Sequence, residues 1–109
     1  MAVERLTDAD FRASLDGAPR AVVCFCARWC GLCMLFAPRF ERLSGEHPHV
    51  RFFRCDTEGE PACRSTVTFE SLPFFAFYED GRYVDGFSTT KEDGFRERLE
   101  ARFGRVPVE

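Results

Sequence analysis

The chain has 109 residues, of which 45% are hydrophobic and 30% charged, and this composition predicts one soluble globular domain spanning residues 1–109. The net charge is −3 and the basic residues are scattered along the chain, so we expect no nucleic-acid partner. No apolar run approaches 18 residues, so no segment is expected to span a membrane.

The N-terminal stretch 1–6 lacks the hydrophobic segment typical of a signal peptide. We therefore expect a cytoplasmic protein whose six cysteines are free or transiently oxidised thiols in a reducing compartment. Residues 2–6 predict a short edge strand. A helix is then expected to start with Thr7 as N-cap and Asp10 as the acidic member of a capping box, and to close at 17–19.

The stretch Ala21–Ala27 is apolar from end to end and predicts a strand buried on both faces. Apolar residues recur at helical spacing after Cys33, so the Cys30-x-x-Cys33 motif is expected at a strand-to-helix junction. There the two sulfurs lie one helical turn apart, close enough to form a disulfide. Cys30 lies where unpaired N–H groups and the helix dipole favour a thiolate, which is the form that attacks. The pattern indicates dithiol–disulfide exchange with other proteins.

Pro38 lies inside the predicted motif helix, where it removes a backbone hydrogen bond. Because the apolar face continues beyond it at Phe40, we expect a kink at Pro38 rather than the end of the helix. Residues 44–49 predict a polar loop, in which His47 and His49 are expected to be solvent-exposed rather than metal ligands.

The rest of the chain alternates strand and helix patterns, and its thirteen Phe predict a core built on aromatic rings. We expect a strand at 50–56 ending in Asp56, a short helix at 58–65 and a strand at 74–78. A hairpin turn at 79–82 should lead into a return strand at 82–87. A last helix should open with a capping pattern at 90–93 and bury Phe95, Leu99 and Phe103. Helix-separated strands imply parallel crossovers with helices on both faces, and the hairpin adds an antiparallel edge. The expected fold is α/β, a three-layer α/β/α sandwich around a mixed central sheet.

Several of these features together resemble the thioredoxin family, from about residue 21 to residue 103. They are the Trp29-Cys30-Gly31-Leu32-Cys33 motif after a buried strand, Pro38, Asp56 at the end of the next strand, Leu72-Pro73, and the Asp80-Gly81 hairpin. The resemblance implies a protein-disulfide reductase with the thioredoxin fold, acting through a mixed-disulfide intermediate. It also implies disulfide-containing target proteins, a thioredoxin-reductase-type electron donor and a monomer.

The resemblance also implies roles for single residues. Cys30 would be the exposed nucleophile and Cys33 the buried resolving thiol, with no bound cofactor and a redox-active disulfide between the two. Pro73 matches the family's cis-proline, which lets the backbone of Leu72 pair with an extended substrate peptide. The residues expected to contact target proteins are Trp29, Gly31, Leu32, Leu72 and Pro73.

The sequence departs from the family at a buried aspartate six residues before the first motif cysteine, where this chain has Cys24. That carboxylate is thought to take the proton of the resolving thiol. A buried thiol is a poor base, so we expect Cys33 to lose its proton less efficiently, through water or not at all. A Cys24→Asp variant should then reduce disulfides faster.

Three further departures are expected to modulate the site. Leu32 replaces the usual proline between the cysteines, which should make the reduction potential less reducing. Cys26 occupies a usually aromatic position. We expect Cys26 to be a small residue that packs beneath the motif. The alternative is that Cys24 or Cys26 exchanges disulfides with the motif pair, but we expect the two to lie on opposite faces of their strand, so that at most one can approach Cys33. Thr89 stands where a glycine often lines the docking groove, which its Cβ would narrow.

Two other functions remain open from the sequence. The loss of the aspartate also suits a peptide-binding module with little redox turnover, which an insulin-reduction assay would separate from a reductase. Cys30 and Cys33 also have the spacing of half a zinc knuckle, although a structural zinc needs a second pair close by, and we expect no metal. Cys55 and Cys63 are expected to be ordinary buried or half-buried residues, with regulatory oxidation, or intermolecular pairing of an exposed thiol, as the alternatives.

Overall fold

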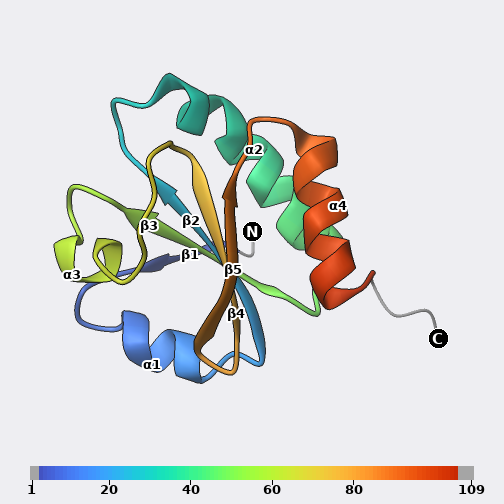
Figure 1. The fold of residues 1–109 in the computed structure, drawn as a ribbon, viewed down its shortest axis with the longest axis horizontal. Helices are drawn as coiled ribbons and strands as arrows, with labels where there is room; N and C mark the ends of the chain where they lie inside the picture. Colours follow the sequence, from blue (N-terminus) through green and yellow to red (C-terminus); the bar gives the residue numbers. More distant parts are fainter. Residues whose placement is uncertain (1–2, 106–109) are drawn as a thin grey trace.

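A computed structural model describes residues 3–105, in which the strands and helices follow the predicted order (Figure 1). The strands are β1 Val3–Leu6, β2 Arg20–Cys26, β3 Arg51–Asp56, β4 Phe74–Glu79 and β5 Arg82–Ser88. The helices are α1 Phe11–Asp16, α2 Gly31–Glu46, α3 Pro61–Arg64 and α4 Glu92–Phe103. Within this part of the chain, no helix combines the length and apolar character that a membrane crossing requires.

The sheet has the strand order β1-β3-β2-β4-β5 and is mixed, as predicted. β1, β3 and β2 run parallel, whereas β4 is antiparallel to β2 and β5 is antiparallel to β4. The expectation that all helix-separated strands run parallel is therefore wrong for β4. The four-residue α3 spans only about 6 Å, too short to return the chain along a strand of about 20 Å.

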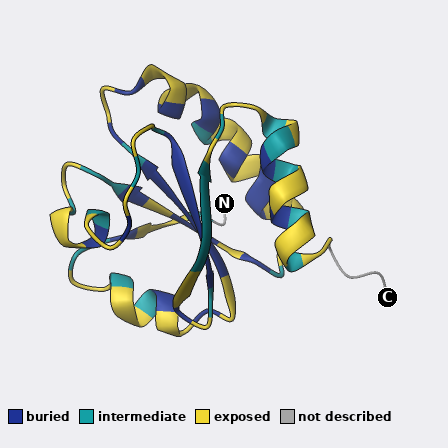
Figure 2. Cartoon of the chain, in the orientation of Figure 1, coloured by how far each residue is buried: buried dark blue, intermediate teal, exposed yellow. Residues whose placement is uncertain are grey.

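Helices cover both faces of the sheet, which confirms the three-layer sandwich (Figure 1). One core lies between the sheet and the helices α2 and α4, and the other lies on the α1 and α3 face. Figure 2 shows the buried residues concentrated along the central strands and on the inner faces of the helices. The α2/α4 core is built on phenylalanine, as expected. The ring centroid of Phe95 lies within 6.2 Å of the centroids of five other rings, which are those of Phe36, Phe40, Phe52, Phe75 and Phe87.

Helix α2 runs unbroken through Pro38, so the prediction that the helix continues past this residue is confirmed. It continues to Glu46, which makes the expected loop at 44–49 three residues shorter. The prediction that His47 is solvent-exposed is wrong, because the side chain is only 1% exposed. Its Nδ1 lies 2.9 Å from the carbonyl of Leu43 and its Nε2 lies 2.8 Å from a carboxylate oxygen of Glu100. His47 therefore joins the end of α2 to α4.

The expected turns and caps are found with small shifts. Thr7 and Asp10 exchange the reciprocal hydrogen bonds of a capping box, but the prediction of Thr7 as N-cap is wrong, because α1 begins at Phe11 and its N-cap is Asp10. The 90–93 capping pattern is wrong in detail: Lys91 is the N-cap of α4 without a side-chain bond, and its N–H donates to Thr89 Oγ1. The β4–β5 hairpin turns at Asp80 and Gly81, whose φ angles of 53° and 84° suit the Asp-Gly pair.

Candidate active site

The Cys-x-x-Cys motif lies at the junction of β2 and α2, as predicted. Cys30 is the N-cap of α2, and its sulfur accepts a hydrogen bond of 3.2 Å from the backbone N–H of Cys33. The carbonyl of Cys30 accepts the first bond of the helix, from Met34 N–H. This geometry places one sulfur against the positive end of the helix and the other one turn further along.

Cys33 is buried, as expected of the resolving thiol, but Cys30 is more enclosed than expected. Cys30 is 7% exposed and Cys33 is 3% exposed, so the description of Cys30 as an exposed nucleophile is wrong in degree. The reason is local packing, because Ala27 lies in the same cluster and Leu72 packs against it. Cys30 is still the more exposed of the two. Burial, together with the hydrogen bond to the Cys30 sulfur, raises the pKa of the Cys33 thiol well above its usual range.

Cys24 and Cys26 lie on the same face of β2, which contradicts the expectation of opposite faces. Residues two apart in a strand share a face, and the two sulfurs are 3.0 Å apart. Burial raises the pKa of the Cys24 thiol, as expected for a poor base. The hydrogen bond from Cys24 instead lowers the pKa of Cys26. We call Cys24, Cys26, Cys30 and Cys33 the motif cluster.

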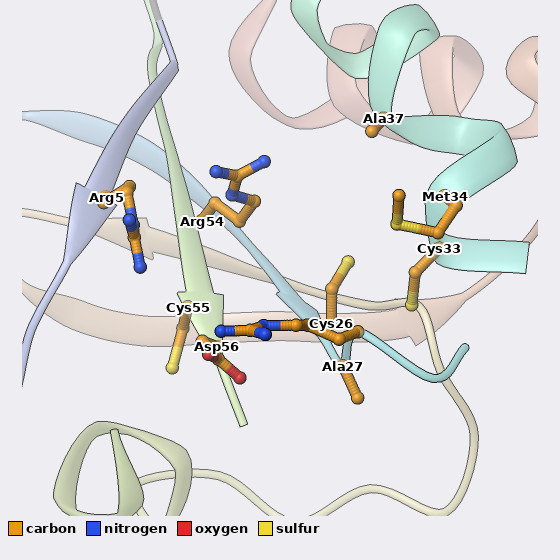
Figure 3. Close-up of a pocket in the computed structure, with 10 residues that line it drawn as sticks. Arg5, Cys26, Ala27, Cys33, Met34, Ala37, Arg54, Cys55 and Asp56 are labelled. Carbon is orange, nitrogen blue, oxygen red and sulfur yellow. The ribbon is translucent and has the colours of Figure 1, made fainter. Parts of the chain in front are cut away.

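A pocket of about 270 Å³ opens beside the motif cluster (Figure 3). In Figure 3 the Cys26 side chain points up from β2 and the Cys33 side chain points down from α2. The remaining lining comes from three arginines and their neighbours: Arg5, Ala27, Arg28, Met34, Ala37, Arg54, Cys55 and Asp56. Sequence reasoning missed this pocket, because it joins residues of β1, β3 and α2 that lie far apart in the chain.

An exposed apolar surface surrounds the start of α2. We call Trp29, Leu32, Met34 and Leu35 the apolar patch, since each is between 50% and 69% exposed. Trp29 is held by a hydrogen bond of 2.9 Å from its indole N–H to Glu58. Trp29 and Leu32 were expected on this surface, whereas Met34 and Leu35 were not. The exposure of Met34 and Leu35 could have been predicted from the run of apolar residues from Leu32 to Phe36, because consecutive helical residues cannot all lie on one buried face.

The Leu72–Pro73 peptide bond is cis, as the resemblance implied. Leu72 packs against the cluster that contains Cys30 and Cys33, so this loop borders the motif. The hydroxyl of Ser88 donates to the carbonyl of Ser71, which holds the end of β5 against the same loop. Thr89 follows directly, and its hydroxyl accepts a hydrogen bond from the N–H of Lys91 before α4, so its expected position in the docking groove stays a prediction. Gly31 has no atom within 4 Å of where a Cβ would lie, which leaves the motif turn open at this position.

The two remaining cysteines form a separate group, which we call the sealed pair. Cys55 and Cys63 are buried as predicted, and a hydrogen bond between their thiols raises the pKa of Cys55 and lowers that of Cys63. All six cysteines are free thiols. Among residues 3–105, no three side chains of Cys, His, Asp or Glu are arranged to hold a metal ion.

Comparison with known proteins places these features in a family. The sequence profile described as Thioredoxin matches residues 2–101. A thioredoxin of Geodia cydonium is 32% identical over 99 residues, covering 85% of this chain and 91% of that protein. Thioredoxin-3 of Dictyostelium discoideum is 38% identical over 82 residues, covering 75% and 79% of the two chains. A chain in the crystal structure of a ferredoxin:thioredoxin reductase and thioredoxin f2 complex superposes with a TM-score of 0.86, at 18% identity, over 93% of this chain and 94% of its own length.

Proposed function

This chain belongs to the thioredoxin family and is a thiol–disulfide oxidoreductase of the protein-disulfide reductase type, and from that premise we propose that Cys30 and Cys33 carry the reaction. The observation that supports this assignment most strongly is the hydrogen bond from Cys33 N–H to Cys30 Sγ. It puts the first sulfur at the N-terminus of α2, where partial positive charge stabilises a thiolate.

In the first step, the Cys30 thiolate attacks one sulfur of a target disulfide. A bond forms between Cys30 and that sulfur, and the other target sulfur leaves as a thiolate. The apolar patch and the Leu72–Pro73 loop border Cys30, so we infer that they hold the target against the motif. An extended target segment would pair with the backbone of Leu72.

In the second step, Cys33 loses its proton and attacks Cys30 Sγ. The bond between Cys30 and the target sulfur attached to it breaks, and that sulfur leaves as a thiolate with the electron pair. An intramolecular disulfide between Cys30 and Cys33 remains. The short reach between the two sulfurs, set by the first turn of α2, makes this step intramolecular. No bound cofactor takes part in this scheme, in which the redox-active group is the disulfide itself.

A protein electron donor of the reductase type would return the disulfide to the dithiol. The structural neighbour crystallised with ferredoxin:thioredoxin reductase supports such a partner. We infer that the chain works as a monomer in a reducing compartment, the cytoplasm. Six free thiols, several of them in close contact, suit that setting.

Insulin reduction by dithiothreitol tests this function. The protein is expected to accelerate the precipitation of reduced insulin, and Cys30→Ser is expected to abolish the acceleration. A wild-type protein without activity would contradict the proposal and would favour a peptide-binding module on the same fold.

A further inference from the structure

The second step of the reaction raises a question of proton transfer. Cys33 is 3% exposed and its pKa is raised by burial, so at neutral pH it holds its proton. Only its thiolate can attack Cys30. In the reduced protein Cys33 hydrogen-bonds to the Cys30 sulfur, but that sulfur is consumed once the mixed disulfide has formed. Another acceptor is needed at this stage.

We propose that Cys26 accepts the proton of Cys33 in the second step, in a role that rests on the proposed function. The Cys26 sulfur lies 3.0 Å from the Cys24 sulfur. Hydrogen bonding with Cys26 is also among the causes that raise the pKa of Cys33. It packs against the cluster that contains Cys30 and Cys33, and it lines the same pocket as Cys33. Figure 3 shows the side chains of Cys26 and Cys33 extending towards one another from β2 and α2.

The surroundings of Cys26 favour its thiolate. Cys24 and Cys33 both hydrogen-bond to its sulfur, and these bonds, with the positive charge of Arg54, lower the pKa of Cys26 against the effect of burial. Arg5 and Arg28 also line the pocket, and Asp56 is its one acidic lining residue, so the charge facing Cys26 from β1, β3 and the motif loop is net positive. The lowered pKa of Cys26 increases the share of its thiolate, which is the form that can take a proton.

Cys24 cannot play the same part. It is almost fully buried and does not line the pocket, and burial raises the pKa of its thiol. Its sulfur instead lies 3.0 Å from that of Cys26, and hydrogen bonding with Cys24 is the largest cause that lowers the pKa of Cys26. Half-buried Cys26 opens to the pocket, so the proton that it takes from Cys33 can pass on to solvent there.

The proton transfer balances without any further reagent. The proton of Cys33 moves to the Cys26 thiolate, and the Cys33 thiolate attacks Cys30 Sγ. The Cys30–target bond breaks, and the target sulfur leaves as a thiolate. This thiolate then takes the proton from Cys26, directly or through water in the pocket, which returns Cys26 to its starting thiolate.

A stopped-flow reaction with limiting 5,5′-dithiobis(2-nitrobenzoate) tests the proposal. Attack by Cys30 releases the first coloured thiolate, and attack by Cys33 releases the second. In Cys26→Ala the first release is expected at the wild-type rate, and the second is expected to slow by at least about tenfold near neutral pH. In the variant, the second release should also accelerate about tenfold per pH unit, since hydroxide must then remove the proton. Cys26→Asp is expected to restore the fast, pH-independent step.

The controls separate the possible failures. Cys63→Ala, in the sealed pair, should leave both releases unchanged, and Cys30→Ser counts colour released by other thiols. Cys26→Ser keeps the side-chain shape and is expected to be as slow as the alanine variant. A second release that is unaffected in both variants overturns this proposal alone, whereas a first release independent of Cys30 overturns the proposed function. If neither variant folds, the pH dependence of the second release in the wild type decides. A rate that does not change with pH supports proton transfer to Cys26, and a rate that rises tenfold per pH unit throughout overturns the proposal.

Discussion

The motif cluster and the sealed pair contain the same chemical group in two different settings. In each, one thiol hydrogen-bonds to another and lowers its pKa, Cys26 in the first and Cys63 in the second. The motif cluster has a helix N-terminus, a pocket and an exposed apolar patch beside it. The sealed pair lies in the core of the opposite face, at 0% and 1% exposure, and although Cys55 borders the same pocket, Cys63 does not. On this account, access and helix position, rather than contact between thiols, distinguish the cysteines that we propose to react from those that only pack.

The rate of disulfide formation with one equivalent of diamide should differ most between the motif cluster and the sealed pair. We expect the Cys30–Cys33 disulfide to form at least about a hundredfold faster than a link between Cys55 and Cys63, because attack requires an accessible thiolate. Non-reducing peptide mapping over time measures both rates. Cys30→Ser serves as the control, in which the fast link should vanish. Equal rates in the wild type would break the comparison.

Alkylation by iodoacetamide isolates the effect of access. The pKa is lowered in both Cys26 and Cys63, so each thiol forms its reactive thiolate more readily than it would without its hydrogen-bonded partner. Of these two thiols, only that of Cys26 lines the pocket, so Cys26 should be alkylated at least about tenfold faster than Cys63. Mass spectrometry of the labelled peptides gives the two rates. The difference should disappear in the unfolded chain, and its persistence there would show that access is not its cause.

The apolar patch is expected to act on target binding rather than on chemistry. Leu35→Ser removes an exposed side chain beside the motif and should raise KM for insulin several-fold, with kcat little changed. Tyr83→Ser on β5 is the matched control, since Tyr83 is also an exposed large side chain but lies outside the patch. A similar rise of KM in both variants would show that the apolar patch has no specific role in target binding.

The smallest expected effect concerns the sealed pair. Cys63→Ala removes a fully buried thiol and its bond to Cys55, which should lower the free energy of unfolding by about 1 kcal/mol. Urea denaturation measures this change. The rate of insulin reduction should stay within about twofold of the wild type, and a larger loss would mean that the sealed pair takes part in the reaction.

Local patterns were sufficient to predict most of the fold and the centre of the site. The buried run before Cys30, the Asp80–Gly81 turn and the spacing of Phe95 and Leu99 are short-range signals, and the elements follow them closely. The antiparallel β4 was not predicted, because its direction depends on how far the chain travels through α3. Burial of His47 was not predicted either, since its partner on α4 lies 53 residues away.

The surroundings of the motif were harder to predict than the motif itself. The strand rule alone puts Cys24 and Cys26 on one face, so that expectation was an error of reasoning rather than a limit of the sequence. The pocket is different, because it brings Arg5 and Arg54 together from two paired strands. That pairing follows from the register of β1 with β3, which no local pattern contains.

Capture of the mixed disulfide tests the central assignment most directly. In Cys33→Ser the second step is blocked, so incubation with a disulfide-containing protein such as insulin should trap the target on Cys30. Mass spectrometry of the adduct identifies the linked residue. The account predicts one covalent complex, joined through Cys30 and released by dithiothreitol. Absence of an adduct, or an adduct joined through any other cysteine, would contradict it.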